Sequence, residues 1–125
     1  MPRELSEADL TRASLSGSNL SGADLHGSRL HAANAVRANL PGANLSGADL
    51  TEANLVEANL AGAKLAGADV TRADLRAADL TEANFEAIQG LDQARRDAAV
   101  GIPMDGAGAA QPGQPARQRA RDTGR

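Results

Sequence analysis

The sequence has 125 residues and a formal net charge of -3, with one phenylalanine and no tryptophan, tyrosine or cysteine. This composition excludes disulfides, thiolate metal sites and a cysteine nucleophile, and it excludes a core of interlocking aromatic rings. The length suits one domain, whose interior must then be built from leucine and alanine.

The N-terminal segment, MPRELSEADL, lacks the apolar stretch of a signal peptide. No window of the chain approaches the ~18 apolar residues that a membrane span requires. We therefore expect a cytoplasmic protein with no membrane partner.

A period of five residues dominates the chain. A large aliphatic or aromatic residue stands at every fifth position from Leu5 to Phe85, except at Ala35. Alanine or serine stands two residues before the large one in sixteen consecutive units, from position 8 to position 83. The residues of this series that we expect to form the core are Leu25, Leu40, Leu45, Leu50, Leu55, Leu60, Leu65, Leu75, Leu80 and Phe85.

This period fits neither a helix nor a straight strand. On a helix, each step of five residues rotates the side chain by about 140° net and would spread the leucines around the cylinder. On one strand, the leucines would alternate between faces. The chain must therefore turn once per repeat, with the small and large residues both pointing inward and turn-forming pairs such as Ser21-Gly22 and Ser46-Gly47 at the corners.

The units resemble the signature of the pentapeptide-repeat family, as in Ala43-Asn44-Leu45-Ser46-Gly47 and Ala48-Asp49-Leu50-Thr51-Glu52. The resemblance implies an all-β fold, a right-handed quadrilateral β-solenoid in which residues 20 apart stack in ladders. Residues 1–88 are expected to form this solenoid in about four coils. At Ala35 we expect a void costing on the order of 2–5 kcal/mol relative to a filled site. The alternative is that Val36 fills the gap through a local distortion.

After Phe85 the repeat decays. We expect a C-terminal capping helix in residues 89–102, running from Leu91 to Val100 and stopping at Gly101. Residues 103–125 are rich in glycine, proline, glutamine and arginine and are expected to be disordered.

No constellation of residues points to catalysis, a metal or a cofactor. His26 and His31 are expected on neighbouring faces, and no serine or threonine has an outward histidine placed to activate it. Stacking at 20 residues predicts two surface ion pairs, Glu52 with Arg72 and Arg37 with Glu57, worth less than ~1 kcal/mol each.

The proposed role is therefore a non-catalytic scaffold that binds an unknown protein partner. The candidate interaction face carries little bulk and consists of Asn19, Asn39, Asn59 and Asp79. The alternative, which the family resemblance suggests, is DNA mimicry with protection or inhibition of DNA gyrase.

Three further expectations concern partners. The acidic ladder of Asp9, Asp49 and Asp69 is interrupted by Arg29, which weakens the case for DNA mimicry. The C-terminal arginines have no aromatic residue beside them, so a nucleic-acid partner is not expected. Few residues cover the N-terminal end, which leaves room for a homodimer through a solenoid end.

Overall fold

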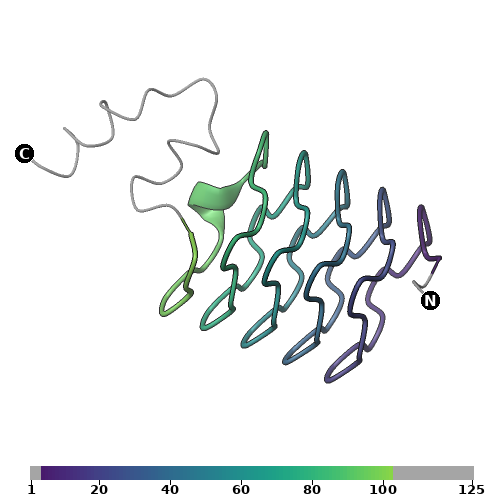
Figure 1. The fold of residues 1–125 in the computed structure, drawn as a ribbon, viewed down its shortest axis with the longest axis horizontal. Helices are drawn as coiled ribbons and strands as arrows, with labels where there is room; N and C mark the ends of the chain where they lie inside the picture. The colour runs from purple at the N-terminus through teal and green to yellow at the C-terminus, as the bar shows by residue number, and fades with distance from the viewer. Residues whose placement is uncertain (1–3, 103–125) are drawn as a thin grey trace, which may run out of the picture.

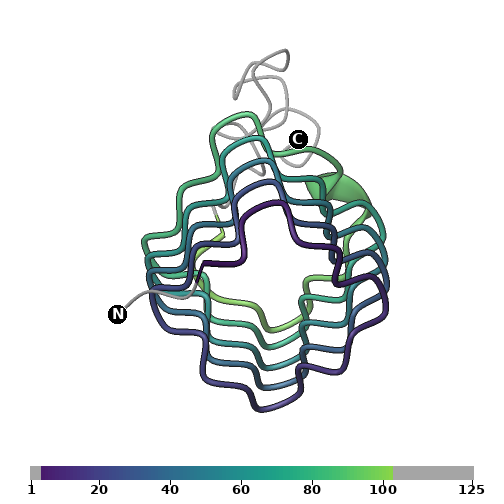
Figure 2. The ribbon, with the colours of Figure 1, turned by 90° about the vertical axis from the view of Figure 1, so that its right-hand side faces the viewer.

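The chain winds as a four-sided coil. The structure, a computed structural model, describes residues 4–102. Parallel bridges join residues that lie 20 apart, such as Glu4 with Asp24 and Asp24 with Asn44. Four pentapeptides therefore complete one turn. The turns stack in layers along the axis (Figure 1), and a view along the coil shows the four-cornered outline repeated from layer to layer (Figure 2).

Each pentapeptide has the same five positions. A small inward residue, a middle residue and a large inward residue form an extended side, and two corner residues follow. In the unit Ala8 to Arg12, the N–H of Leu10 donates to the carbonyl of Arg29 in the next coil at 2.7 Å, and the N–H of Arg29 donates back to Ala8 at 2.9 Å. The coils are therefore joined as neighbouring strands of a parallel sheet are joined, one bridge per side.

The corners are tight turns. The N–H of each small inward residue donates to the carbonyl of the large residue three positions earlier, as from Ala23 to Leu20 at 3.0 Å. The second corner residue has a positive φ, 67° at Gly22 and 57° at Arg37. A positive φ at the third residue of such a turn favours glycine. This requirement explains why glycine recurs in the sequence at the five-residue period.

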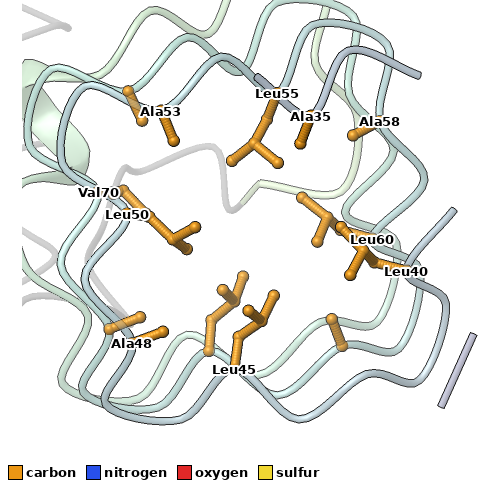
Figure 3. Close-up of a cluster of buried hydrophobic side chains, with 14 of the residues drawn as sticks. Ala35, Leu40, Leu45, Ala48, Leu50, Ala53, Leu55, Ala58, Leu60 and Val70 are labelled. Carbon is orange, nitrogen blue, oxygen red and sulfur yellow. The ribbon is translucent and has the colours of Figure 1, made fainter. Parts of the chain in front are cut away.

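The core is a stack of leucines and alanines inside the coil (Figure 3). All ten large residues expected in the core are buried, from Leu80 at 0% exposed to Phe85 at 8%. The first-coil residues Leu5, Leu10 and Leu15 are only partly buried. The interior is therefore closed along the sides and less covered at its N-terminal end.

A cavity lies beside Ala35, which is buried in a column otherwise filled by leucine (Figure 3). The cavity volume is about 10 Å³, counted as the space that the centre of a water molecule can occupy. Only leucine and alanine side chains line it. Val36 does not fill it. This residue keeps the regular first-corner position, where its N–H donates to Oδ1 of Asn34 at 3.2 Å and its carbonyl accepts from Gly17 at 2.9 Å.

The expected helix from Leu91 to Val100 is wrong. The structure has a 3₁₀ helix of three residues, η1 (Leu91–Gln93), after which the coil resumes. Arg95 bridges Asp74 and Val100 bridges Asp79, so the spacing changes from 20 to 21 residues. The backbone N–H of Val100 donates to the carbonyl of Ala78 at 3.0 Å, a partner in the coil below and not in a helix.

The inserted residue has a packing reason. Gly90, with a φ of 79°, lies so close to Thr71 that a Cβ at this position would overlap its backbone. The added residue lets Leu91 enter the core in its place, where it is 0% exposed. With Arg95 and Val100 added, all four ladders are five residues deep, one more than the about four coils expected.

The described part contains no helix that is long and apolar enough to cross a membrane. The expected disordered tail, residues 103–125, lies outside the described residues, as do residues 1–3 of the expected solenoid.

Candidate functional site

The middle side chains hold the corners that follow them. The Oδ1 of an Asn or Asp at the middle position accepts the N–H of the first corner residue, as in Asn44 with Ser46 at 3.0 Å and Asn54 with Val56 at 3.1 Å. These bonds satisfy a backbone group that the turn would otherwise leave without a partner. The sequence signal for this role is that Asn or Asp recurs directly before the large residue. From the sequence alone, these side chains were interpreted only as surface residues.

Four of these corners carry threonine, and the hydroxyl adds a second bond. Oγ1 donates to the aspartate in the pairs Thr11–Asp9, Thr51–Asp49, Thr71–Asp69 and Thr81–Asp79, at 2.6 to 2.7 Å. The hydrogen bonds from Thr11 and Thr81 lower the pKa of the aspartate in their own unit, Asp9 and Asp79. At Asp49 burial raises the pKa, but the two bonds from Thr51 and the nearby basic residues His31 and Arg29 together outweigh it, and the net shift is downward. The charged carboxylates are therefore part of the turn.

His31 joins one of these pairs. Its Nδ1 lies 2.7 Å from Oγ1 of Thr51, which itself donates to Asp49. Because the threonine proton is directed at the carboxylate, the hydroxyl accepts from His31, and the ring is a donor here. A general base that activates a nucleophile must accept the proton instead, so this arrangement does not activate Thr51. Within residues 4–102, no group of three or more potential ligands is placed to hold a metal ion.

Both expected ion pairs between coils form. Arg37 Nε lies 2.8 Å from Oε1 of Glu57, and Arg72 Nη2 lies 3.1 Å from Oε2 of Glu52. A third pair, between Arg76 and Asp74 within one unit, was not anticipated. Arg76 donates to both carboxylate oxygens, at 2.9 and 2.7 Å, and these bonds lower the pKa of Asp74. The signal was an arginine at the first corner, directly after an Asp-Leu pair.

Charge divides the surface of the first three coils into two halves. We call residues 14–22, 34–42 and 54–62 the neutral half, because Arg37 and Glu57 are its only charged residues and they pair with each other. The other half, residues 4–12, 24–32 and 44–52, carries Glu4, Glu7, Asp9, Arg12, Asp24, Arg29, Asp49 and Glu52. Arg29 does lie in the ladder between Asp9 and Asp49.

The structure brings the four residues of the candidate interaction face together. Asn19 bridges Asn39, Asn39 bridges Asn59 and Asn59 bridges Asp79, and the ladder continues to Val100, which is 53% exposed. Oδ1 of Asn59 accepts the N–H of Ala61 at 3.1 Å, as elsewhere.

Asn39 is different because the first corner residue after it is Pro41, which has no N–H to donate. Within the described part of the chain, the side chain of Asn39 has no hydrogen-bond partner, although its backbone is bridged on both sides. Asn39 is exposed. Both its amide oxygen and its amide nitrogen are therefore available to another molecule.

The sequence matches the family of pentapeptide repeats in 8 copies, over residues 4–40, 28–65 and 53–87. The chain belongs to the pentapeptide repeat family. A comparison with curated proteins found no match to the sequence. The family match indicates no enzyme family.

Solved structures of the same family resemble the chain. A pentapeptide repeat protein from the cyanobacterium Cyanothece 51142 is 38% identical, with a TM-score of 0.40, and the match covers 70% of this chain and 63% of that one. A pentapeptide repeat protein from Nostoc PCC 7120 is 30% identical, with a TM-score of 0.48 and coverage of 77% and 76%. QnrB1, a plasmid-mediated fluoroquinolone resistance protein, is 19% identical, with a TM-score of 0.46 and coverage of 74% and 60%. This chain thus spans less than two thirds of the Cyanothece protein.

Proposed function

We propose that the protein is a non-catalytic scaffold that binds a protein partner through its neutral half, with Asn39 as the central polar contact. The observation that carries the proposal is the unpaired amide of Asn39 in the middle of a surface whose only two charged side chains, Arg37 and Glu57, pair with each other.

The neutral half is suited to contact with another protein. Interfaces are depleted of charge at their centre, because desolvating an unpaired charge is costly. Here the one pair of opposite charges, Arg37 with Glu57, is already neutralised within the molecule. Val36 and Val56, both partly exposed, lie at adjacent corners of the same half and add apolar area. The second corners Gly22, Gly42 and Gly62 carry no side chain to hold a partner away.

Asn39 supplies specificity in this surface. Its neighbours Asn19 and Asn59 have their amide oxygens engaged with their own turns. A partner that satisfies both groups of Asn39 gains two hydrogen bonds without breaking one in the scaffold, whereas a partner that leaves them unpaired loses about 1–3 kcal/mol in a dry interface.

The test is capture of partners from the native cell extract with the wild-type chain and two variants. Asn39→Arg places a bulky charge at the centre of the neutral half and removes no hydrogen bond from the fold. Lys64→Glu changes charge on the other side of the coil, where Lys64 is exposed. A partner that is retained by Lys64→Glu and lost by Asn39→Arg supports the proposal. A partner retained by both variants contradicts it.

DNA mimicry is the alternative. It requires a long row of like charges at the spacing of duplex phosphates, about one per 1.7 Å. In this protein Arg29 interrupts the row of Asp9 and Asp49, and Lys64 lies between Asn44 and Asn84 in the adjacent ladder. These mixed charges favour the scaffold. Inhibition of supercoiling by purified gyrase at micromolar protein would favour mimicry instead.

A further inference from the structure

The N-terminal end of the solenoid presents an open edge. In the second coil, the middle residues Arg29, Asn34 and Asn39 each donate a backbone N–H to the coil before and accept one on their carbonyl. The corresponding residues of the first coil are Asp9, Ser14 and Asn19. Among residues 4–102, nothing takes their N–H groups or bonds to their backbone carbonyls. Figure 2 views the molecule from this end, with the first coil in front.

Apolar side chains lie just inside this edge. Leu5, Leu10 and Leu15 are only partly buried, whereas the leucines two coils further on, Leu45, Leu50 and Leu55, are at most 2% exposed. The end thus combines unpaired backbone groups with partly exposed leucines, which is the combination that templates pairing with another chain.

The shape of the edge restricts what can cover it. An ordinary extended strand stays straight, but this edge turns a corner every five residues and offers one bridging residue per side. A straight peptide can therefore pair with one side only. A partner that satisfies every side must itself turn at the same interval, and the first coil of a second copy has that geometry.

The C-terminal end of another copy is a poorer match. Its inward residues Phe85, Ile88 and Leu91 are already covered, at 8%, 3% and 0% exposed. The inward leucines of the first coil are only partly buried, so more apolar surface remains to be covered at the N-terminal edge.

We propose that two copies associate head to head through their first coils. A twofold axis across the edge makes the facing sides antiparallel. Each middle residue exposes both its N–H and its carbonyl, so facing middle residues exchange two hydrogen bonds, as in an antiparallel pair. The partly exposed leucines of the two copies then close one continuous core.

Charge on the rim gives the pairing a salt dependence. Among the described residues of each first coil, Glu4, Glu7, Asp9 and Arg12 carry a net charge of -2, three acids against one base. Bringing two such rims together is unfavourable at low ionic strength, and salt screens the repulsion. Dimerisation is therefore expected to strengthen as salt rises.

The first test measures the mass of the full chain against concentration by light scattering and sedimentation. Ser14→Pro removes an N–H that has no partner within the described residues and places a ring on the edge. Val100→Lys changes the opposite end. We expect a dimer for the wild type and Val100→Lys, and an association at least tenfold weaker for Ser14→Pro. A monomer at all concentrations overturns the proposal, as does a dimer that only Val100→Lys breaks.

The second test fixes the orientation. The sequence has no cysteine, so single spin labels can be placed at Ser16→Cys in the first coil and at Val56→Cys two coils away in the same column. Head-to-head pairing makes the axial separation of the two Val56 labels about 19 Å larger than that of the Ser16 labels, at ~4.8 Å per coil and two coils on each side. Equal separations at the two sites indicate head-to-tail stacking and contradict the proposal. Circular dichroism of Ser14→Pro checks that loss of the dimer is not loss of the fold.

Discussion

The backbone N–H of Ala35 donates to the carbonyl of Asn54 at 2.7 Å, which holds the short side chain of Ala35 in the inward column beneath Leu55. The cavity beside Ala35 is lined by apolar side chains alone, so it has nothing to bind a water. We expect Ala35→Leu to stabilise the fold by about 1–2 kcal/mol and to raise Tm by ~4–8 °C per kcal/mol. Thermal unfolding followed by circular dichroism measures the effect.

The matched control for the cavity is Ala58→Leu. Ala58 is 1% exposed and does not line the cavity, so a leucine there overpacks the core and should cost about 1–3 kcal/mol. A lower Tm for Ala35→Leu as well would show that no space exists beside Ala35.

Ser28 occupies a small inward position and is 0% exposed, and its hydroxyl has no hydrogen-bond partner. Its column neighbours in the coils below and above are Ala8 and Ala48. Because an unsatisfied buried hydroxyl costs about 1–3 kcal/mol, Ser28→Ala should raise the free energy of unfolding by an amount in that range. Urea unfolding gives the difference. Ser18→Ala, at a partly exposed position of the same kind, should change little, and equal effects at both sites would refute the explanation.

The positive φ at the second corner position predicts opposite effects on stability for two opposite substitutions, alanine to glycine and glycine to alanine. Ala77 has a φ of 60°, which is unfavourable for any residue with a Cβ, whereas Gly62 has a φ of 69°. At Gly62 an added Cβ would come no closer than 4.0 Å to the backbone of Gly42, so only the conformation opposes it. We expect Ala77→Gly to stabilise and Gly62→Ala to destabilise, each by about 0.5–1 kcal/mol. Changes of the same sign in the two urea midpoints would contradict this account.

The hydrogen bonds to the aspartates predict loss of stability in acid. Arg76 lowers the pKa of Asp74, and the pKa of Asp49 is also lowered, because the bonds from Thr51 and the nearby His31 and Arg29 together outweigh the effect of burial. A carboxylate with a lowered pKa in the fold stabilises it above the unfolded pKa of about 3.9, and the stability is lost as the pH falls through the lowered value. Tm should therefore be flat from pH 7 to 5 and fall below about pH 4.

The variant Asp74→Asn keeps an acceptor for the N–H of Arg76 but cannot titrate. Its Tm at pH 7 should be lower than that of the wild type, and its fall in acid should be smaller. If the two proteins lose the same number of degrees between pH 5 and pH 2.5, the titration of Asp74 does not contribute.

Asn39 and Asn59 occupy the same ladder and should behave differently when truncated. Asn59→Ala removes the acceptor of the Ala61 N–H and should cost about 1 kcal/mol. Asn39→Ala removes no hydrogen bond and should leave the urea midpoint unchanged. Equal losses would show that the side chain of Asn39 has a structural partner and is not free for binding.

The sequence predicts the fold well because one pattern determines it. A five-residue period of large and small residues is compatible with a chain that turns once per unit, and the residues it places inward, such as Leu45 and Leu50, are buried. The pairing of Arg37 with Glu57 follows from the same stacking. The unfilled position at Ala35 could also be read directly, since a missing side chain in a regular column leaves space.

The end of the solenoid could not be read in this way. Leu91 to Val100 has the spacing of a helix, but Ala94 and Ala99 also fit the small inward positions of two further units once one residue is added. The sequence does not reveal that addition, because it depends on the contact between Gly90 and Thr71. The availability of Asn39 was missed for a similar reason. In the other turns the Asn side chain accepts the N–H of the first corner residue. Pro41 has no N–H, so its effect on Asn39 can be recognised only once that hydrogen bond is known.

The 20-residue turn sets the step by which this molecule can change length during evolution or engineering. Duplication or deletion of 20 residues between Leu25 and Leu80 adds or removes one whole layer and leaves every ladder above and below facing the same way. An insertion of five residues would instead rotate everything after it by one side, so that a charged ladder would follow the neutral one. Viable indels should therefore come in whole layers, and the separation between the two ends of the rod should vary in increments of about 4.8 Å.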